Sequence, residues 1–134
     1  MPWVILTYII YYNNLEINTK WIKEKEFSYE WGYEAVKDIF SEKSKPHPEV
    51  IFSSAWFLTG GILKYIDEKE IKVPEDLKII SFDDYPFIKY LKYPLITIKQ
   101  DTETMGKTAF LLLLKMLKGE KIESQRIKTS IKIY

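Results

Sequence analysis

The chain lacks cysteine and has only one histidine, His47, and one arginine, Arg126, among its 134 residues. The absence of cysteine excludes disulfide bridges and thiolate chemistry. One histidine, placed between two prolines in a connector, offers neither a zinc-binding pattern nor a base for acyl transfer, and we expect it in a surface turn. One arginine leaves almost no candidate for bidentate recognition of guanine. We therefore expect no metal, no cofactor and no enzymatic activity.

The chain also lacks an excess of charge of one sign. Its 20 lysine and arginine residues face 19 aspartate and glutamate residues, so the net charge is +1. Such a balance provides no basic field that would hold nucleic acid through its phosphates. Hydrophobic residues make up 46% and charged residues 29%, which is typical of a globular protein, and the length suits one domain with a modest core.

Long hydrophobic runs are absent as well. The apolar start of the chain ends at Ile10 and is shorter than the roughly 20 residues that cross a bilayer. No basic segment precedes it and no small-residue cleavage site follows it, as a secretory signal would require. We expect a buried strand over Val4–Ile10, a cytoplasmic location and no membrane partner.

Strand-like and helix-like patterns alternate through the rest of the chain. The patterns predict extended segments over residues 19–27, 50–53, 77–82, 95–99 and 126–134, and helices over residues 29–40, 55–69 and 102–118. This alternation is typical of right-handed βαβ units, and predicts an α/β fold with a parallel-sheet three-layer sandwich. In such sheets ligands bind beyond the carboxyl ends of the strands, close to helix N-termini.

Asp83 and Asp84 end one of the predicted strands and are the most informative polar pair. Two adjacent carboxylates at this place cannot both face the core. One of them could accept hydrogen bonds from the hydroxyls or amides of a ligand. The alternative is a turn before Pro86 in which both side chains bond to local amides.

Other residues at this predicted edge also have two interpretations. Ser53 and Ser54 could bind an anion or a sugar oxygen, or could simply cap the following helix. Phe27 and Trp56 could stack on a ligand ring or belong to the core. Gly60 and Gly61 do not form a phosphate-binding loop, and close helix packing explains them better.

Four motifs with consistent spacing resemble those of one protein family. The run Val73-Pro74-Glu75-Asp76 continues to Phe82-Asp83-Asp84 and resembles the VPEDVSVVGFDD signature of lactose-repressor/galactose-repressor (LacI/GalR) regulators. The run from Pro94 to Gln100 resembles the PLTTVRQ element of the same regulators, and Met105-Gly106 with the helix after it resembles their MGxxAxxLLLxxI stretch. The segment from Phe27 to Ala35 resembles the region of their GYEA helix.

The resemblance implies a fold, a ligand and a set of ligand-binding residues. The fold is that of periplasmic sugar-binding proteins, in which two α/β subdomains enclose a small effector such as a sugar or a purine. Phe27 matches an aromatic residue that stacks on the effector, Asp83 matches the cleft carboxylate, and Gln100 lies at the crossover between subdomains. Ala55 and Trp56 stand where the family usually has Asn-Asp, so a polar contact is replaced by an indole at the cleft.

The resemblance also implies partners. Regions matching the helix after Ser54 and the loop Tyr90–Tyr93 help to form the family's homodimer. Residues 1–14 match nothing in the family and residues 15–134 match its effector-binding region, so DNA would be bound only through a helix-turn-helix domain that this sequence does not contain. We expect a sensing and dimerisation fragment of a regulator. The alternatives are a sugar-binding component of a transport system, a small hydrolase or transferase, and a truncated relic that retains only fold and self-association.

Overall fold

The computed structural model describes residues 18–41 and 47–134. The expected strand Val4–Ile10 lies outside the described residues. Among the described residues, no helix has both the length and the apolarity needed to cross a membrane.

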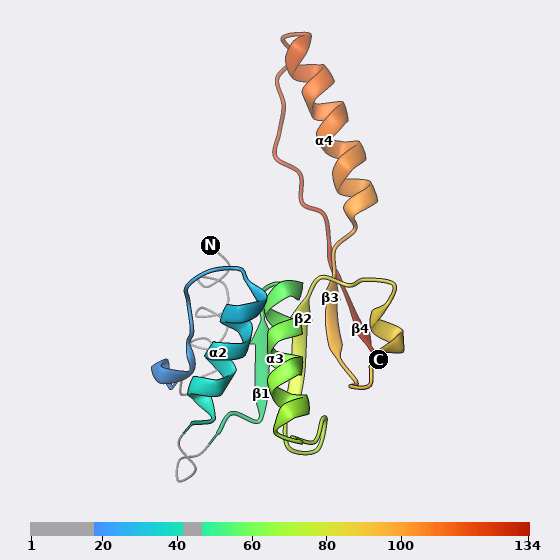
Figure 1. Ribbon diagram of the computed structural model, residues 1–134. Helices are drawn as coiled ribbons and strands as arrows, with labels where there is room; N and C mark the ends of the chain where they lie inside the picture. Colours follow the sequence, from blue (N-terminus) through green and yellow to red (C-terminus); the bar gives the residue numbers. More distant parts are fainter. Residues whose placement is uncertain (1–17, 42–46) are drawn as a thin grey trace.

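A four-stranded sheet organises the described part of the chain (Figure 1). Its order is β1 (Val50–Ser53), β2 (Lys78–Phe82), β3 (Ile96–Lys99) and β4 (Ser130–Ile133). The first three strands are parallel, and β4 runs antiparallel to β3. The predicted α/β class with a largely parallel sheet is therefore confirmed, and the predicted extended tail contributes β4 at the edge of the sheet.

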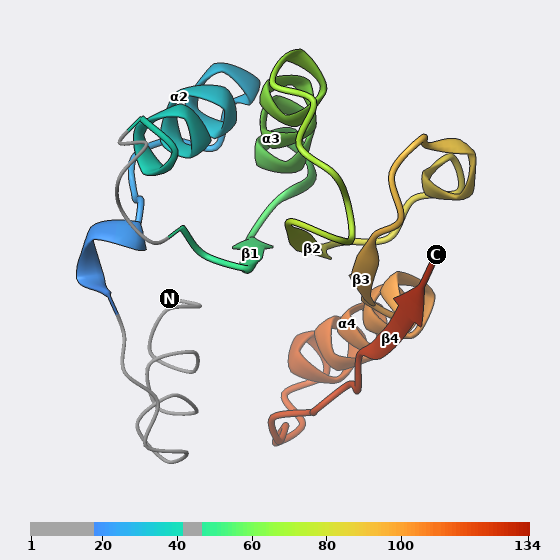
Figure 2. The same cartoon turned by 90° about the horizontal axis from the view of Figure 1, so that it is seen from below.

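Two helices, α2 (Tyr29–Ile39) and α3 (Trp56–Glu68), lie side by side over one face of this sheet (Figure 2). Ser28 caps α2, because its Oγ accepts a hydrogen bond of 3.1 Å from the Trp31 N–H. Two glycines allow the helices to meet backbone to backbone. A Cβ atom on Gly61 would lie 2.0 Å from the Tyr29 carbonyl oxygen, and one on Gly32 would lie 2.2 Å from that of Leu58. The packing role expected for the glycine pair in α3 is thus confirmed at Gly61.

The core lies between the sheet and these helices. Alternate residues of a strand point to opposite faces, so only one set of strand side chains enters this core. The buried hydrophobic residues are Val36, Ile62, Tyr65, Ile66, Leu77, Ile79, Ile88 and Leu95. Ile88 comes from a short 3₁₀ helix, η2 (Ile88–Tyr90), in the connection between β2 and β3.

The opposite face of the sheet is also apolar. The strand register places Phe52, Ile80, Ile96 and Ile133 in one cross-strand row. Phe82, Ile98 and Ile131 form the next row of the same face. The two β4 members are strongly exposed, Ile131 at 71% and Ile133 at 79%. Apolar and polar residues alternate in this tail, a pattern that predicts a half-buried strand, so the strong exposure of both residues contradicts that prediction.

Helix α4 (Thr102–Leu117) projects beyond the carboxyl ends of the parallel strands, and an extended segment leads back to β4 (Figure 1). Its ends follow the sequence: Asp101 caps it with a 3.0 Å bond from the Thr104 N–H, and Gly119 ends it at a φ of 72°. No residue of α4 is buried. The apolar periodicity of the helix predicts that Met105, Ala109, Leu112, Leu113 and Met116 point inward, but of these only Leu112 is even half-buried. The apolar stripe exists, but no other element of the described residues packs against it.

Two local predictions are wrong. The segment expected to be extended over residues 19–27 begins instead with a 3₁₀ helix, η1 (Thr19–Trp21), capped by Asn18, and pairs with no described strand. Its Lys and Glu residues leave few side chains for a core-facing strand. His47 is half-buried rather than a surface turn residue, because its ring stacks on Phe40 with centroids 4.7 Å apart.

Candidate ligand-binding site

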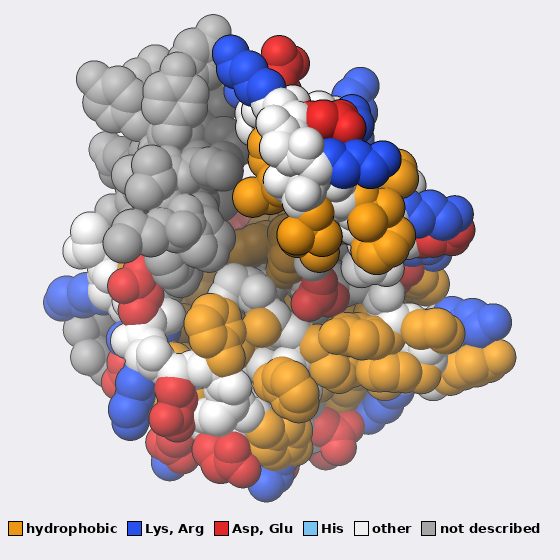
Figure 3. Space-filling model, turned by 90° about the horizontal axis from the view of Figure 1, so that it is seen from above, with side chains coloured by type: hydrophobic (Ala, Val, Ile, Leu, Met, Phe, Trp, Pro, Cys, Tyr) orange, Lys and Arg blue, Asp and Glu red, His pale blue; other side chains and the backbone are white. Residues whose placement is uncertain are grey.

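The carboxyl ends of β1, β2 and β3 face the same edge of the sheet, and α2 and α3 begin there. Figure 3 looks onto this edge and shows hydrophobic and acidic side chains next to one another. Parallel α/β sheets bind ligands at this place, because strand ends and helix N-termini leave backbone and side-chain polar groups unpaired. The candidate residues from the sequence all come from segments at this edge.

Asp83 and Gln100 meet at the edge. The Gln100 Nε2 donates a hydrogen bond of 2.7 Å to the Asp83 Oδ1. Asp83 adopts the left-handed backbone region with a φ of 76°, and its N–H donates to the Ile98 carbonyl at 3.1 Å. Aspartate tolerates this conformation better than most residues, yet it remains unusual outside glycine and marks a position held by its surroundings. The structure therefore brings together two residues that lie 17 positions apart in the sequence.

Asp84 has a different environment from its neighbour. Its side chain is only 5% exposed and pairs with the Lys132 Nζ at 3.0 Å. Its Oδ1 accepts hydrogen bonds from the Thr97 hydroxyl at 3.0 Å and the Tyr134 hydroxyl at 2.6 Å. Burial raises the pKa of Asp84, but the bonds from Tyr134, Lys132 and Thr97 outweigh it and hold the pKa below its usual value. The two aspartates therefore differ: Asp84 is fully bonded to groups of the protein, whereas Asp83 lies at the edge of the sheet, where a ligand could bind.

Ser53, the last residue of β1, and Ser54 do not cap α3, so one of their two predicted roles is wrong. The N-cap residue is Ala55, which makes no side-chain capping bond. Ser53 is 3% exposed, and its hydroxyl donates to the Ala55 carbonyl at 3.0 Å. The Thr59 hydroxyl lies 2.9 Å from that of Ser53 and 2.7 Å from that of Ser81. These hydroxyls join the strand ends to the first turn of α3, so Ser53 is a structural residue rather than a ligand contact.

An aromatic group forms beside Trp56. The Trp56 ring lies 5.9 Å from Tyr85 and 5.0 Å from Phe87, and those two rings stack at 5.6 Å. The sequence singled out Trp56 but missed its partners, although the aromatic residues flanking Pro86 directly after the Asp pair were a usable signal. Trp56 is half-buried, so its indole forms an apolar wall at this edge rather than standing free.

Phe27 is separate from this group. It is 69% exposed and lines a cavity of about 190 Å³ together with Trp31, Ser54 and Leu58. Gln100 lines another cavity, of about 560 Å³, between the base of α4 and the segment that leads into β4. The five candidates Phe27, Ala55, Trp56, Asp83 and Gln100 therefore come from segments at one edge, and a side-chain hydrogen bond joins Asp83 to Gln100.

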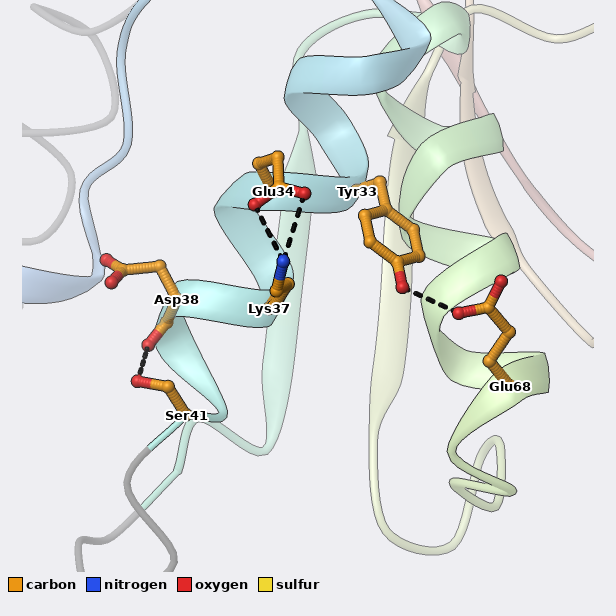
Figure 4. Close-up of polar contacts among 6 residues, drawn as sticks. All are labelled: Tyr33, Glu34, Lys37, Asp38, Ser41 and Glu68. Carbon is orange, nitrogen blue, oxygen red and sulfur yellow. Dashed lines mark hydrogen bonds and ion pairs between the residues drawn. The ribbon is translucent and has the colours of Figure 1, made fainter.

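The outer faces of α2 and α3 hold another polar group, shown in Figure 4. The Tyr33 hydroxyl donates a 2.6 Å hydrogen bond to the Glu68 Oε2, and this bond raises the pKa of Tyr33 to about 12. Lys37 pairs with Glu34 one turn away on α2. The Tyr33–Glu68 bond connects the two helices, whereas the Lys37–Glu34 pair lies within α2. Both lie toward the amino ends of the strands, so they do not belong to the candidate site. Among residues 18–41 and 47–134 there is no group of acidic, histidine or cysteine side chains that could hold a metal ion.

Comparison with known sequences identifies a family. A model of the periplasmic binding protein-like domain matches residues 9–134. The chain is similar to the HTH-type transcriptional repressor PurR of Serratia proteamaculans, with 32% identity over 120 residues, and to that of Yersinia pestis, with 29%. Each alignment covers 90% of this chain but 35% of the relative, so the chain spans about a third of the length of these proteins.

Solved structures with a similar fold are also regulators. The transcription regulator CcpA of Lactococcus lactis superposes with a TM-score of 0.78 at 24% identity, over 96% of this chain and 46% of that one. A LacI-family regulatory protein from Chloroflexus aggregans gives 0.80 at 25% identity, covering 91% and 44% of the two chains. A LacI-family regulator from Lactobacillus casei with bound sucrose gives 0.78 at 22% identity, covering 95% and 47%.

Proposed function

This chain belongs to the periplasmic binding protein-like family, as part of the effector-binding core of LacI/GalR regulators, and we propose that it binds a small effector at the carboxyl edge of its sheet. The contact between Asp83 and Gln100 is the observation that carries this proposal. A carboxylate acceptor and an amide, held together at this edge, suit the polar edge of a small molecule. In this proposal the chain senses the effector and catalyses no reaction. An effector that binds one of two conformations more tightly shifts the equilibrium between them.

The proposed effector is a sugar or a purine. Asp83 would accept hydrogen bonds from neighbouring hydroxyls or ring N–H groups, and Gln100 can both donate and accept. Phe27 is exposed enough to stack on a flat ring or a sugar face. The bound sucrose of the Lactobacillus casei regulator supports a sugar. Trp56 and Ala55 would contribute an apolar wall instead of polar contacts, which favours ligands with a hydrophobic face.

The proposed partners follow from the family and from exposed residues. We propose that residues 15–134 form the effector-binding region, and that two copies pair through α3 and the loop Tyr90–Tyr93. Phe57 on α3 is 66% exposed and Tyr90 is 78% exposed, and aromatic residues of this kind are enriched at protein interfaces. Contact with DNA would come from a helix-turn-helix domain outside these 134 residues, as the names of the relatives suggest.

A titration tests the proposed site. Tryptophan fluorescence or calorimetry would follow the binding of sucrose, galactose, guanine and hypoxanthine to the chain and to its Asp83→Ala and Phe27→Ala variants. Loss of a hydrogen bond to a charged group costs about 1.5–3 kcal/mol, so Asp83→Ala should weaken binding about 10- to 100-fold.

Matched controls are available in the chain. Asp67→Ala removes an exposed carboxylate far from the site, and Phe110→Ala removes a phenylalanine that is 61% exposed on α4. Both should bind like the parent. Equal affinity in Asp83→Ala, with an unchanged circular dichroism spectrum, would place the effector elsewhere. A folded chain that binds none of the four compounds would favour the alternative of a relic that keeps only its fold and self-association.

A further inference from the structure

Residues 100–129, termed the arm, connect β3 to β4 and include α4. The last residue of β3, Lys99, pairs with the first residue of β4, Ser130, so the arm leaves and re-enters the sheet at neighbouring points. The departing end is Gln100, and its side-chain amide is bonded to Asp83 at 2.7 Å. The arm itself buries no residue of α4, so its orientation depends on what holds these two ends.

Asp84 holds the returning end. Its carboxylate pairs with the Lys132 ammonium at 3.0 Å and accepts a hydrogen bond of 2.6 Å from the Tyr134 hydroxyl. Lys132 lies in β4, which follows the arm, and Tyr134 comes directly after β4. It also accepts a 3.0 Å bond from Thr97 in β3, so a single buried side chain joins β3 to the end of the chain. Two adjacent aspartates therefore bind the two ends of the arm: Asp83 binds Gln100 at the departing end, and Asp84 binds the strand that follows the returning end.

The two grips differ in strength. Asp84 has three partners and a side chain that is 5% exposed, and buried charge-assisted bonds of this kind are the strong ones. Asp83 is half-buried, and Gln100 is its one side-chain partner among the described residues. An effector hydroxyl that takes the Oδ1 atom of Asp83 competes with Gln100, while Asp84 keeps its three partners.

We infer that Asp84 is a positioning residue for the effector site: it anchors β4 and fixes Asp83 in its left-handed conformation, so that effector binding frees only the departing end of the arm. The inference rests on the proposed function at Asp83. Asp83 sits at a φ of 76°, a conformation that persists where neighbours over-determine it. Its own N–H bond to the Ile98 carbonyl constrains it directly, and Asp84, bonded to Thr97 in β3 and Lys132 in β4, fixes the next residue of the same turn. Asp84 touches no effector and acts through its neighbour.

Spin-label distance measurements on the whole chain test this inference directly. The sequence contains no cysteine, so Lys64→Cys on α3 and Lys115→Cys on α4 give two unique labelling sites, both exposed. The parent, diluted into unlabelled chain so that distances between two copies do not contribute, should give one narrow distance distribution. Asp84→Ala should broaden it and should weaken sucrose or purine binding about 10-fold, although Asp84 does not contact the ligand. Asp83→Ala should shift the distribution less, because the returning end stays anchored.

Two further sets of variants keep the test decisive. Asp67→Ala is the matched control, because Asp67 also receives a tyrosine hydroxyl, from Tyr93 at 2.6 Å, and a lysine, from Lys92 at 2.9 Å, away from the arm. It should change neither readout. If Asp84→Ala fails to fold, Tyr134→Phe and Lys132→Met remove one partner each and should broaden the distribution by smaller amounts.

The outcomes separate this inference from the proposed function. Narrow, unchanged distances in folded Asp84→Ala or in both milder variants would overturn the anchoring, whether or not a ligand binds. Broadened distances with unchanged affinity would overturn the positioning of Asp83. A parent that binds none of the four compounds would instead contradict the proposed function, while the distances without ligand still decide the anchoring.

Discussion

Replacing Gly61 with alanine tests the packing of α2 against α3. The added methyl carbon would lie 2.0 Å from the Tyr29 carbonyl oxygen and 2.6 Å from the Tyr33 nitrogen, whereas ordinary contacts begin at 3.4 Å. The obstacle is backbone rather than a flexible side chain, so the helices must separate by about 1 Å or more. That movement would loosen the contacts of Ile62 and Tyr65, which are buried beside it.

The expected cost follows from two opposing effects. Overpacking a close contact costs about 1–3 kcal/mol, and the rigid backbone here favours the upper end. Alanine offsets about 1 kcal/mol of this through its higher helix propensity. We expect a net loss of about 2 kcal/mol in the free energy of unfolding. In a chain of this size that loss lowers Tm by roughly 8 °C. Urea and thermal denaturation followed by circular dichroism would measure it.

Two other glycines serve as controls. An alanine at Gly60 would meet the side-chain ring of Tyr29 at 3.1 Å, which can move, so the effect should be small. An alanine at Gly106 in α4 would meet nothing within 4 Å and should stabilise that helix by up to about 1 kcal/mol. The reasoning is refuted if Gly61→Ala is as stable as the parent, or if Gly106→Ala is the more damaging of the two.

Three more predictions follow from polar contacts. Thr59→Val leaves two buried serine hydroxyls without their shared partner and should cost about 1–3 kcal/mol in urea denaturation; an unchanged midpoint would contradict the hydroxyl network. The pKa of Asp84 is lowered on folding, so its stabilisation is present above the unfolded value and is lost as pH falls through the folded one. The stability of the parent should consequently fall more steeply in acid than that of Asp84→Asn, and parallel curves would show that the ionised Asp84 carboxylate does not stabilise the fold. The raised pKa of Tyr33, about 12, should appear as a late phenolate absorbance that is missing in Tyr33→Phe and shifts to lower pH in Glu68→Gln.

Local patterns predicted much of the body of the fold. The apolar β-branched run that ends at Phe82 forms β2, and residues of the types that favour helix ends, Ser28, Asp101 and Gly119, stand at the ends of α2 and α4. Each of these features depends on a few neighbouring residues, because caps and strand patterns act over one or two turns. Asp83 and Gln100 were both selected from the sequence, but their mutual hydrogen bond follows only from the crossing of two distant strand ends.

The failed predictions involve long-range partners. The stripe of α4 was read as inward because apolar periodicity normally means burial, but periodicity does not say whether a surface is present to cover it. Ser53 and Ser54 are residues of the type that caps helices. The Ser53 hydroxyl instead points into the protein, where it accepts a hydrogen bond from the buried Thr59 hydroxyl six residues later. Local sequence patterns could not predict that Asp84 binds Tyr134 and Lys132, because both lie about 50 residues away.

The pairing of Lys99 with Ser130 makes β3 and β4 a hairpin whose connection happens to be a whole helix. Loop-closure entropy grows only slowly with length, so the sheet tolerates connections of very different size at this point. The arm can therefore lengthen, shorten or change its sequence while the strands on either side keep their register. A chain built this way offers a natural place for inserting a reporter domain, with the sheet serving as an unchanged base.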